Sequence, residues 1–207
     1  MPDLNRIYLY RMTHIGNIPH ILANGITHIA SANANAAYVP IGDGSLINRR
    51  TQIALPNGRL LSDYIPFYFG GRMPMLLVIQ HGTNGVTATT PEDIVYCITT
   101  VAQIIANGLD YYFTDGHAVA TISTVYASNQ IADIEELVDF DAVKVKYWRN
   151  DYDLDLKRRM EAEFLVGNDI PAQAIVGYVV YNEAARDRLM EMGIPQNKIL
   201  IKRECYF

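Results

Sequence analysis

The chain has 207 residues, of which 50% are hydrophobic and 19% are charged, and its formal net charge is −5 at pH 7. This composition is typical of a globular protein with a substantial core and excludes a disordered chain. The negative net charge argues against indiscriminate nucleic-acid binding, and no apolar run approaches the roughly 18 residues that a membrane-spanning helix needs.

The first part of the chain predicts one strand, one helix and a long irregular segment. Residues 7–11 are rich in β-formers and predict a strand. A short helix is expected from Asn17, which can cap it, to Gly25, with Pro19 in its first turn. The hydrophobic residues of segment 31–63 show no sustained helix or strand period, and irregular segments of that length are usually functional or mobile.

The rest of the chain predicts strands mixed with helices and no internal repeat. One helix is expected from the capping-box-like start at Thr90 to Gly108, and another from Asn182 to Met192. Residues 129–160 predict short helical turns and loop. Strands are expected at residues 75–80, 111–113, 161–166, 175–181 and 198–202. Because few long helices separate these strands, a mixed α+β sheet is favoured over a doubly wound parallel sheet.

The most informative feature is the pair Glu161 and Glu163 at the start of a predicted strand. Side chains at positions i and i+2 of a strand share one face, so two carboxylates would lie side by side before an apolar triplet. Holding two negative charges together there is costly. Such a pair suits a site where a sugar becomes an oxocarbenium ion. The alternative interpretation is a strand start with two solvated glutamates.

Three further motifs have residue types that could bind a ligand. His14 lies between a predicted strand and a predicted helix, where an imidazole and free N–H groups can reach a ligand or simply cap the helix. Arg49 and Arg50 can fork onto phosphates or carboxylates, or form a solvated pair. The aromatic segment 64–69 can stack on a nicotinamide or a nucleobase, or can build a small satellite core.

Basic residues gather in two clusters, 144–149 and 157–159. Either could hold a phosphate backbone or a pyrophosphate, and the alternative is a solvated face with surface ion pairs. Cluster 157–159 comes directly before the carboxylate pair. A substrate that is anionic on one side and turns cationic at its reacting sugar would suit this order, and NAD fits that description.

Several common signals are missing from the sequence. There is no dinucleotide-binding GxGxxG motif after a strand, no P-loop and no G-x-S-x-G elbow. The histidines and the two cysteines, Cys97 and Cys205, lack metal-ligand spacing, so no metal site is expected. Cys97 reads as a buried thiol. With no signal-peptide pattern at residues 1–6, we expect a cytoplasmic protein in a reducing environment.

Taken together, these motifs resemble the DarT toxins, bacterial enzymes that ADP-ribosylate single-stranded DNA and pair with the DarG macrodomain antitoxin. The resemblance runs from Thr13-His14-Ile-Gly-Asn17 through Asn48-Arg49-Arg50 and the aromatic segment to Phe113-Thr-Asp-Gly-His-Ala118 and Ala162-Glu163-Phe-Leu-Val166. It is closest to the thymidine-modifying branch, and the guanine-modifying branch stays possible. It implies a single ADP-ribosyltransferase-like domain over residues 1–207, with split mixed β-sheets and an NAD cleft between them.

The resemblance also implies roles for individual residues. Glu163 would be the catalytic glutamate, assisted by Arg50 or Arg49, with Arg50 preferred. The residues implied to contact NAD are His14, Gly16, Asn17, Gly25, Thr27, Tyr64 and Phe67. A substrate loop over residues 115–155 would hold DNA, with contacts from Lys144, Lys146, Tyr147, Trp148 and Arg149. One position departs from the expected pattern, because glutamine is expected where this chain has Glu161.

The expected reaction breaks the bond between the ribose C1′ and nicotinamide in NAD, with Glu163 hydrogen-bonding the ribose 2′-OH. A base nitrogen then attacks C1′, and that base must be unpaired because N3 is occupied in a duplex. Two other functions compete with this one. An NAD glycohydrolase or a protein-directed ADP-ribosyltransferase would use the same site, and a non-catalytic nucleic-acid-binding module would use the carboxylates only structurally. A two-carboxylate glycosidase is a weaker third alternative, because two carboxylates on one face of a strand cannot easily flank a glycosidic bond.

Overall fold

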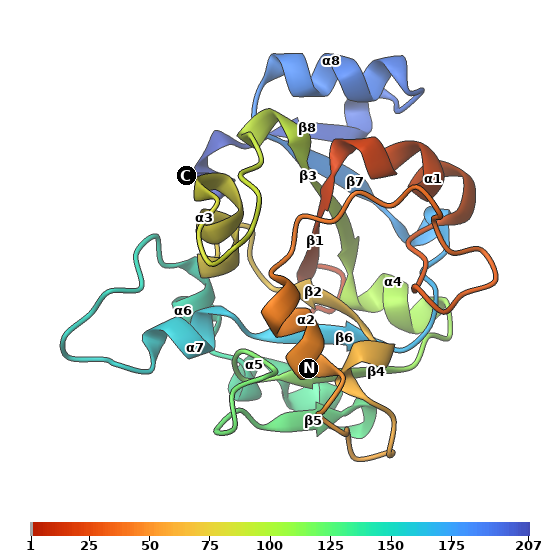
Figure 1. The fold of residues 1–207 in the computed structure, drawn as a ribbon. Coiled ribbons are helices and arrows are strands. Elements are labelled where there is room, and N and C mark those ends of the chain that lie inside the picture. Colours follow the sequence, from red (N-terminus) through yellow and green to blue (C-terminus); the bar gives the residue numbers. More distant parts are fainter. Residues whose placement is uncertain (1) are drawn as a thin grey trace.

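The computed structural model describes residues 2–207 and contains an eight-stranded sheet in the order β5-β4-β6-β2-β1-β3-β7-β8 (Figure 1). Neighbouring strands are antiparallel except β7 and β8, so the sheet is mixed. The strands are β1 (Tyr8–His14), β2 (Ile65–Tyr68), β3 (Ile94–Thr100), β4 (Tyr111–Thr114), β5 (Val125–Ala127), β6 (Glu163–Val166), β7 (Gly177–Val180) and β8 (Ile199–Ile201). The predicted α+β class is confirmed.

The helices are short and flank the sheet (Figure 1). They are α1 (Ile18–Asn24), α2 (Gly44–Arg50), α3 (Pro74–His81), α4 (Val101–Ala106), α5 (Ile134–Leu137), α6 (Phe140–Lys144), α7 (Leu156–Met160) and α8 (Glu183–Glu191). Within residues 2–207, none of them has the length and apolar character that crossing a membrane requires.

The sheet is nearly split between β1 and β2. Strand β1 pairs with β3 from Tyr8 to His14, but its register with β2 consists of the single pair Tyr10 and Tyr68. Two halves result, β5-β4-β6-β2 and β1-β3-β7-β8, and Figure 1 shows their strands running in clearly different directions. This matches the expected split of the sheet.

The core lies on both faces of the sheet. The fully buried strand β3 alternates between them, sending Val95 and Cys97 into one apolar cluster and Tyr96 and Ile98 into the other. The first cluster also contains Phe164 of β6, so it joins the two halves of the sheet. The halves are therefore held together by packed side chains more than by backbone pairing.

Two predicted elements were wrong in type. Residues 75–80, predicted as a buried strand, form α3, which starts at Pro74 and ends at Gly82 in a left-handed conformation. The helix predicted from Thr90 to Gly108 is instead a short 3-10 turn, strand β3 and helix α4. Its first half is rich in β-branched and aromatic residues, which pack well between two neighbouring strands.

A third difference concerns the carboxylate pair. Strand β6 begins at Glu163, and Glu161 is the residue that ends α7. Glu161 is therefore not on the strand, although it stays only two residues from Glu163. Both side chains are buried, at 6% and 0% exposure, so the alternative of two solvated glutamates is wrong.

Candidate active site

Glu163 is held at the start of β6 by groups from three other segments. Its backbone N–H donates to Thr114 Oγ1 of β4 at 3.0 Å. Its carboxylate accepts from the Ala118 backbone N–H at 2.9 Å and from Arg50 Nη1 at 2.8 Å. A fully buried carboxylate is stable only with such partners. Each carboxylate oxygen keeps a free lone pair, so the group can still accept a hydrogen bond from a ligand.

The structure separates the two neighbouring arginines. Helix α2 is capped by Asp43, whose carboxylate accepts from Ser45 N at 2.8 Å, and it carries both arginines in its last turn. Arg50 points to Glu163, whereas Arg49 donates to the Val119 carbonyl at 3.3 Å. The sequence alone could not distinguish them. The second amino group of Arg50, Nη2, is buried and has no hydrogen-bond partner among residues 2–207.

His117 lies beside this ion pair, with its Nδ1 3.6 Å from a Glu163 oxygen. Burial lowers the pKa of His117, and the nearby Glu163 charge opposes that effect only in part. The imidazole is therefore neutral at pH 7. Sequence reasoning gave this residue no role. Its position could have indicated a role, because His117 directly follows Thr114-Asp115-Gly116, which ends a strand, and residues that follow strand ends often form functional sites.

A cavity of about 390 Å³ opens next to Arg50 and His117, between the two halves of the sheet. Strand β1, helix α1, the irregular segment after it, helix α2 and strand β2 all contribute to its wall. Three of the predicted NAD contacts line it: Asn17, Thr27 and Tyr64. Lining residues that the sequence analysis did not assign include Arg11, His20, His28 and Tyr68.

The polar wall of this cavity is fixed by hydrogen bonds. Asn17 donates to Thr13 Oγ1 at 3.0 Å and to the Val39 carbonyl at 2.9 Å, so it ties α1 to the irregular segment. His28 Nε2 lies 2.7 Å from the Ser62 carbonyl. Asn17 makes no side-chain cap to α1, contrary to the prediction, because its Oδ1, the atom that would cap the helix, accepts from Val39 N at 2.8 Å.

Four residues predicted to contact NAD do not line the cavity. His14 Nδ1 accepts from Gly16 N at 3.0 Å, which is the local cap that the alternative interpretation described. Gly25 adopts φ 79° and packs against the Ile170 backbone. Phe67 is 1% exposed in the core, because strand alternation turns Tyr68 of the same segment toward the cavity instead.

Two of the three cations of cluster 157–159 are neutralised within the fold, whereas Lys157 is exposed. Arg158 donates to Asp115 at 2.9 Å and to Asp155 at 2.7 Å. Arg159 contacts Asp139 at 2.9 Å and Asp153 at 2.6 Å. Asp115 and Asp139 come from separate segments and could not be matched to these arginines from the sequence, whereas Asp155 is within four residues of both. The two arginines therefore form structural ion pairs, and they are not available as a phosphate site.

The segment between α6 and α7 carries the other basic cluster and projects from the body of the protein (Figure 1). Lys144, Lys146 and Arg149 are exposed, and the side chain of Lys144 has only a loose ion pair with Asp141 at 3.7 Å. Tyr147 is 74% exposed. Trp148 packs edge-on against Phe207 at 5.8 Å between ring centroids. This segment combines exposed cations with aromatic rings.

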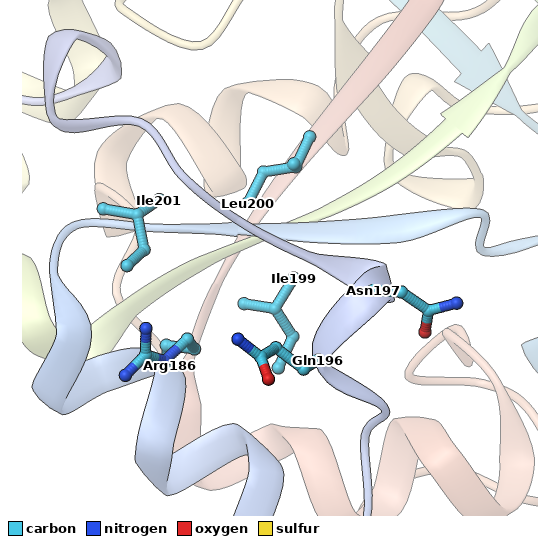
Figure 2. A pocket seen from close by; sticks show the side chains of 6 residues that line it. All are labelled: Arg186, Gln196, Asn197, Ile199, Leu200 and Ile201. Carbon is cyan, nitrogen blue, oxygen red and sulfur yellow. The ribbon is translucent and has the colours of Figure 1, made fainter.

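A second hollow lies away from this chemistry, beside β8 and α8 (Figure 2). Its wall is made of Arg186, Gln196, Asn197, Ile199, Leu200 and Ile201. Arg186 is the one titratable residue in this wall, and its guanidinium contacts Asp187 at 2.8 Å. Within residues 2–207, no group of three or more histidine, cysteine or acidic residues could hold a metal ion.

Comparison with known proteins identifies the class of this fold and site. A family model described as "ssDNA thymidine ADP-ribosyltransferase, DarT" matches residues 10–207. The DNA ADP-ribosyl transferase of Escherichia coli O127:H6 is 31% identical over 193 residues, covering 91% of this chain and 87% of that protein. The chain belongs to the DarT family, as the sequence motifs indicated.

Two further matches support this assignment. The structure of Thermus sp. 2.9 DarT in complex with ADP-ribosylated ssDNA superposes with a TM-score of 0.85 at 25% identity, covering 100% of this chain and 98% of that one. A DNA ADP-ribosyl transferase-DNA ADP-ribosyl glycohydrolase fusion protein of Thermosipho africanus is 30% identical over 203 residues. The match covers 96% of this chain and 49% of the fusion protein.

Proposed function

We propose that this protein transfers ADP-ribose from NAD to a base, thymidine in preference, of single-stranded DNA. The observation that carries the proposal is Glu163: a fully buried carboxylate bonded to the Ala118 amide and to Arg50, which lines the cavity between the two half-sheets. Membership of the DarT family supports the reaction class.

In the proposed reaction the C1′–nicotinamide bond of NAD breaks and positive charge develops on the ribose. Glu163 accepts a hydrogen bond from the ribose 2′-OH and stabilises that charge. Arg50 holds the carboxylate in place, because the two side chains form a buried pair at a separation of 2.8 Å. A preorganised charge of this kind is usually the largest catalytic contribution. The neutral His117 adds no competing positive charge next to the developing cation.

The acceptor is proposed to be an unpaired base whose N3 attacks C1′. In a duplex this nitrogen is occupied, so the strand must be single. We assign strand binding to Lys144, Lys146, Tyr147, Trp148 and Arg149, since exposed cations with aromatic rings are the usual means of holding a single strand. Asn17, Thr27 and Tyr64 are proposed to contact NAD from the cavity wall.

A macrodomain antitoxin that removes ADP-ribose from DNA is the proposed partner, and the proposed setting is the cytoplasm. The fusion of a transferase to a glycohydrolase in Thermosipho africanus supports the pairing.

The test is incubation with radiolabelled NAD and, in separate reactions, a single-stranded oligonucleotide, the same sequence as a duplex, a carrier protein, or no acceptor. We expect label on the single strand only. Glu163→Gln should lower the transfer rate by roughly 100-fold or more, as removal of one stabilising group does elsewhere. The exposed Glu191 supplies a matched control, Glu191→Gln, which should label DNA like the wild type. Label on the carrier protein, or NAD cleavage that is indifferent to DNA, would favour the alternative enzymes.

A further inference from the structure

One half-buried arginine, Arg72, makes no hydrogen bond within the fold. It lies between the end of β2 and the start of α3, and its Nε is buried without a partner among residues 2–207. Its two amino groups make no hydrogen bond with these residues either, and they are not buried. The other half-buried arginines of residues 2–207 each donate to a protein oxygen: Arg11, Arg50, Arg59, Arg158, Arg159, Arg186 and Arg188. The charge and the donors of Arg72 are therefore available to a ligand.

Aromatic rings hold the Arg72 guanidinium in place. Its Cζ lies 4.2 Å from the centroid of the Phe207 ring and 5.6 Å from the centroid of the Tyr147 ring. Cations within about 6 Å of a ring centroid are attracted to the face of the ring. Phe207 is itself fixed by Gln80 of α3, whose Oε1 accepts from Phe207 N at 3.0 Å, and by its edge-on contact with Trp148. The rings orient the guanidinium without using any of its N–H donors.

Arg72 lies between the cavity and the segment to which we assign strand binding. Tyr68 and Met75 line the cavity, whereas Arg72 does not. Because three residues span at most roughly 11 Å, the Cα atoms of Arg72 and Met75 lie within that distance of each other. On its other side Arg72 contacts Tyr147, which belongs to the segment between α6 and α7. A strand that extends along this segment and delivers a base to the cavity passes Arg72.

We propose that Arg72 binds a backbone phosphate of the single strand, between the bases held by Tyr147 and Trp148 and the base that reacts. The inference rests on the proposed function. A guanidinium can form two parallel N–H···O bonds to a phosphate, and Arg72 Nη1 and Nη2 have no other partner among residues 2–207. Because Arg72 does not line the cavity, the phosphate belongs to DNA and not to the pyrophosphate of NAD. Tyr147 is 74% exposed, so its ring stays open to a base while it contacts Arg72.

The test measures binding of a single-stranded oligonucleotide that contains one thymine, to the wild type and to Arg72→Met, over a range of salt concentrations. We expect the affinity to fall by roughly 10-fold, as loss of one charged hydrogen bond does elsewhere, and the salt slope to decrease by roughly 1. The KM for DNA should rise by a similar factor with kcat nearly unchanged, and the affinity for NAD in calorimetry should not change. Arg186→Met removes a cation beside β8 and is the matched control, which should bind the oligonucleotide like the wild type.

Neutral links in the DNA distinguish a phosphate contact from a structural role of Arg72. Each oligonucleotide of a series carries one methylphosphonate link, at successive positions beside the thymine. Neutralising a phosphate that the protein contacts should weaken binding to the wild type. At one position this loss should disappear in Arg72→Met and persist in Arg72→Lys, which keeps the charge. Arg72→Gln is also neutral, and it carries the same prediction if the methionine variant does not fold.

A wild-type salt slope in Arg72→Met, with the wild-type loss at every methylphosphonate position, would overturn the inference and leave the proposed function intact. An equal loss of affinity for NAD and for DNA would also overturn it, because the cation would then serve the dinucleotide. Failure of the wild type to bind or label the oligonucleotide would instead remove the proposed function itself.

Discussion

The ion pair between Arg50 and Glu163 gives the sharpest prediction about stability. The atoms are 2.8 Å apart, and the side chains are 12% and 0% exposed. Replacing Arg50 by methionine leaves a buried carboxylate with only the Ala118 hydrogen bond. Breaking a buried pair by removing one partner typically costs 3–5 kcal/mol, and because one hydrogen bond remains we expect a loss of about 3 kcal/mol in the free energy of unfolding.

Urea unfolding of Arg50→Met, Glu163→Gln and the double variant measures this quantity. The double variant should lose less than the sum of the single variants, since no uncompensated charge is left. Arg49→Met is the matched control. Its guanidinium donates to one carbonyl, that of Val119, at 3.3 Å, so its loss should cost no more than about 1 kcal/mol.

Equal destabilisation by the two methionine variants, or additive behaviour in the cycle, would refute this description of the pair. The same variants also report on the reaction. Arg50→Met should abolish transfer to DNA, whereas Arg49→Met should retain most of it. Because stability and activity are measured on the same proteins, a misfolded variant cannot be mistaken for an inactive one.

Three smaller effects should accompany these. Asp43→Ala removes the cap of α2 and should cost about 1 kcal/mol in the free energy of unfolding. The hydrogen bond from the Ser45 side chain lowers the pKa of Asp43, so this contribution should be present at neutral pH and should vanish as the pH falls through that lowered pKa. Acid unfolding of the two proteins would show the difference. Thr114→Val leaves the buried Glu163 amide unpaired and should cost about 1–3 kcal/mol in urea unfolding. Lys146→Ala and Arg149→Ala should each weaken oligonucleotide binding and reduce its salt slope by roughly 1, with NAD affinity unchanged in calorimetry.

Local signals predicted the elements whose ends are marked in the sequence. Helix α8 is capped by Asn182, whose side chain accepts from Ala185 N, as its residue type indicated. The buried strand that carries Glu163 was found from its apolar run. Glu163 itself was predicted as a site residue because burying a carboxylate beside an apolar strand costs free energy, which partners within the fold must offset.

The remaining features depend on contacts between distant segments, which no local pattern contains. The run from Ile94 to Ile105 has apolar residues at both strand and helix spacing, so only packing against β1 and β7 decides its first half as a strand. Arg50 and Arg49 are neighbours in sequence, and which one meets Glu163 depends on how α2 is oriented. Cluster 157–159 resembled a phosphate site because two of its aspartate partners, Asp115 and Asp139, come from distant segments.

The cavity itself has a local cause in Pro66. Proline has no N–H, so at this position β2 cannot donate to a strand beside it. The Pro66 carbonyl, which a continued ladder would pair with backbone, instead accepts from the Arg11 guanidinium at 3.2 Å. Pairing between β1 and β2 is thereby confined to Tyr10 and Tyr68, and the half-sheets separate on the side of Pro66. Because Tyr68 lines the cavity and also lies opposite Glu163, the residue that joins the halves connects the strand that carries the carboxylate to the opening that they leave.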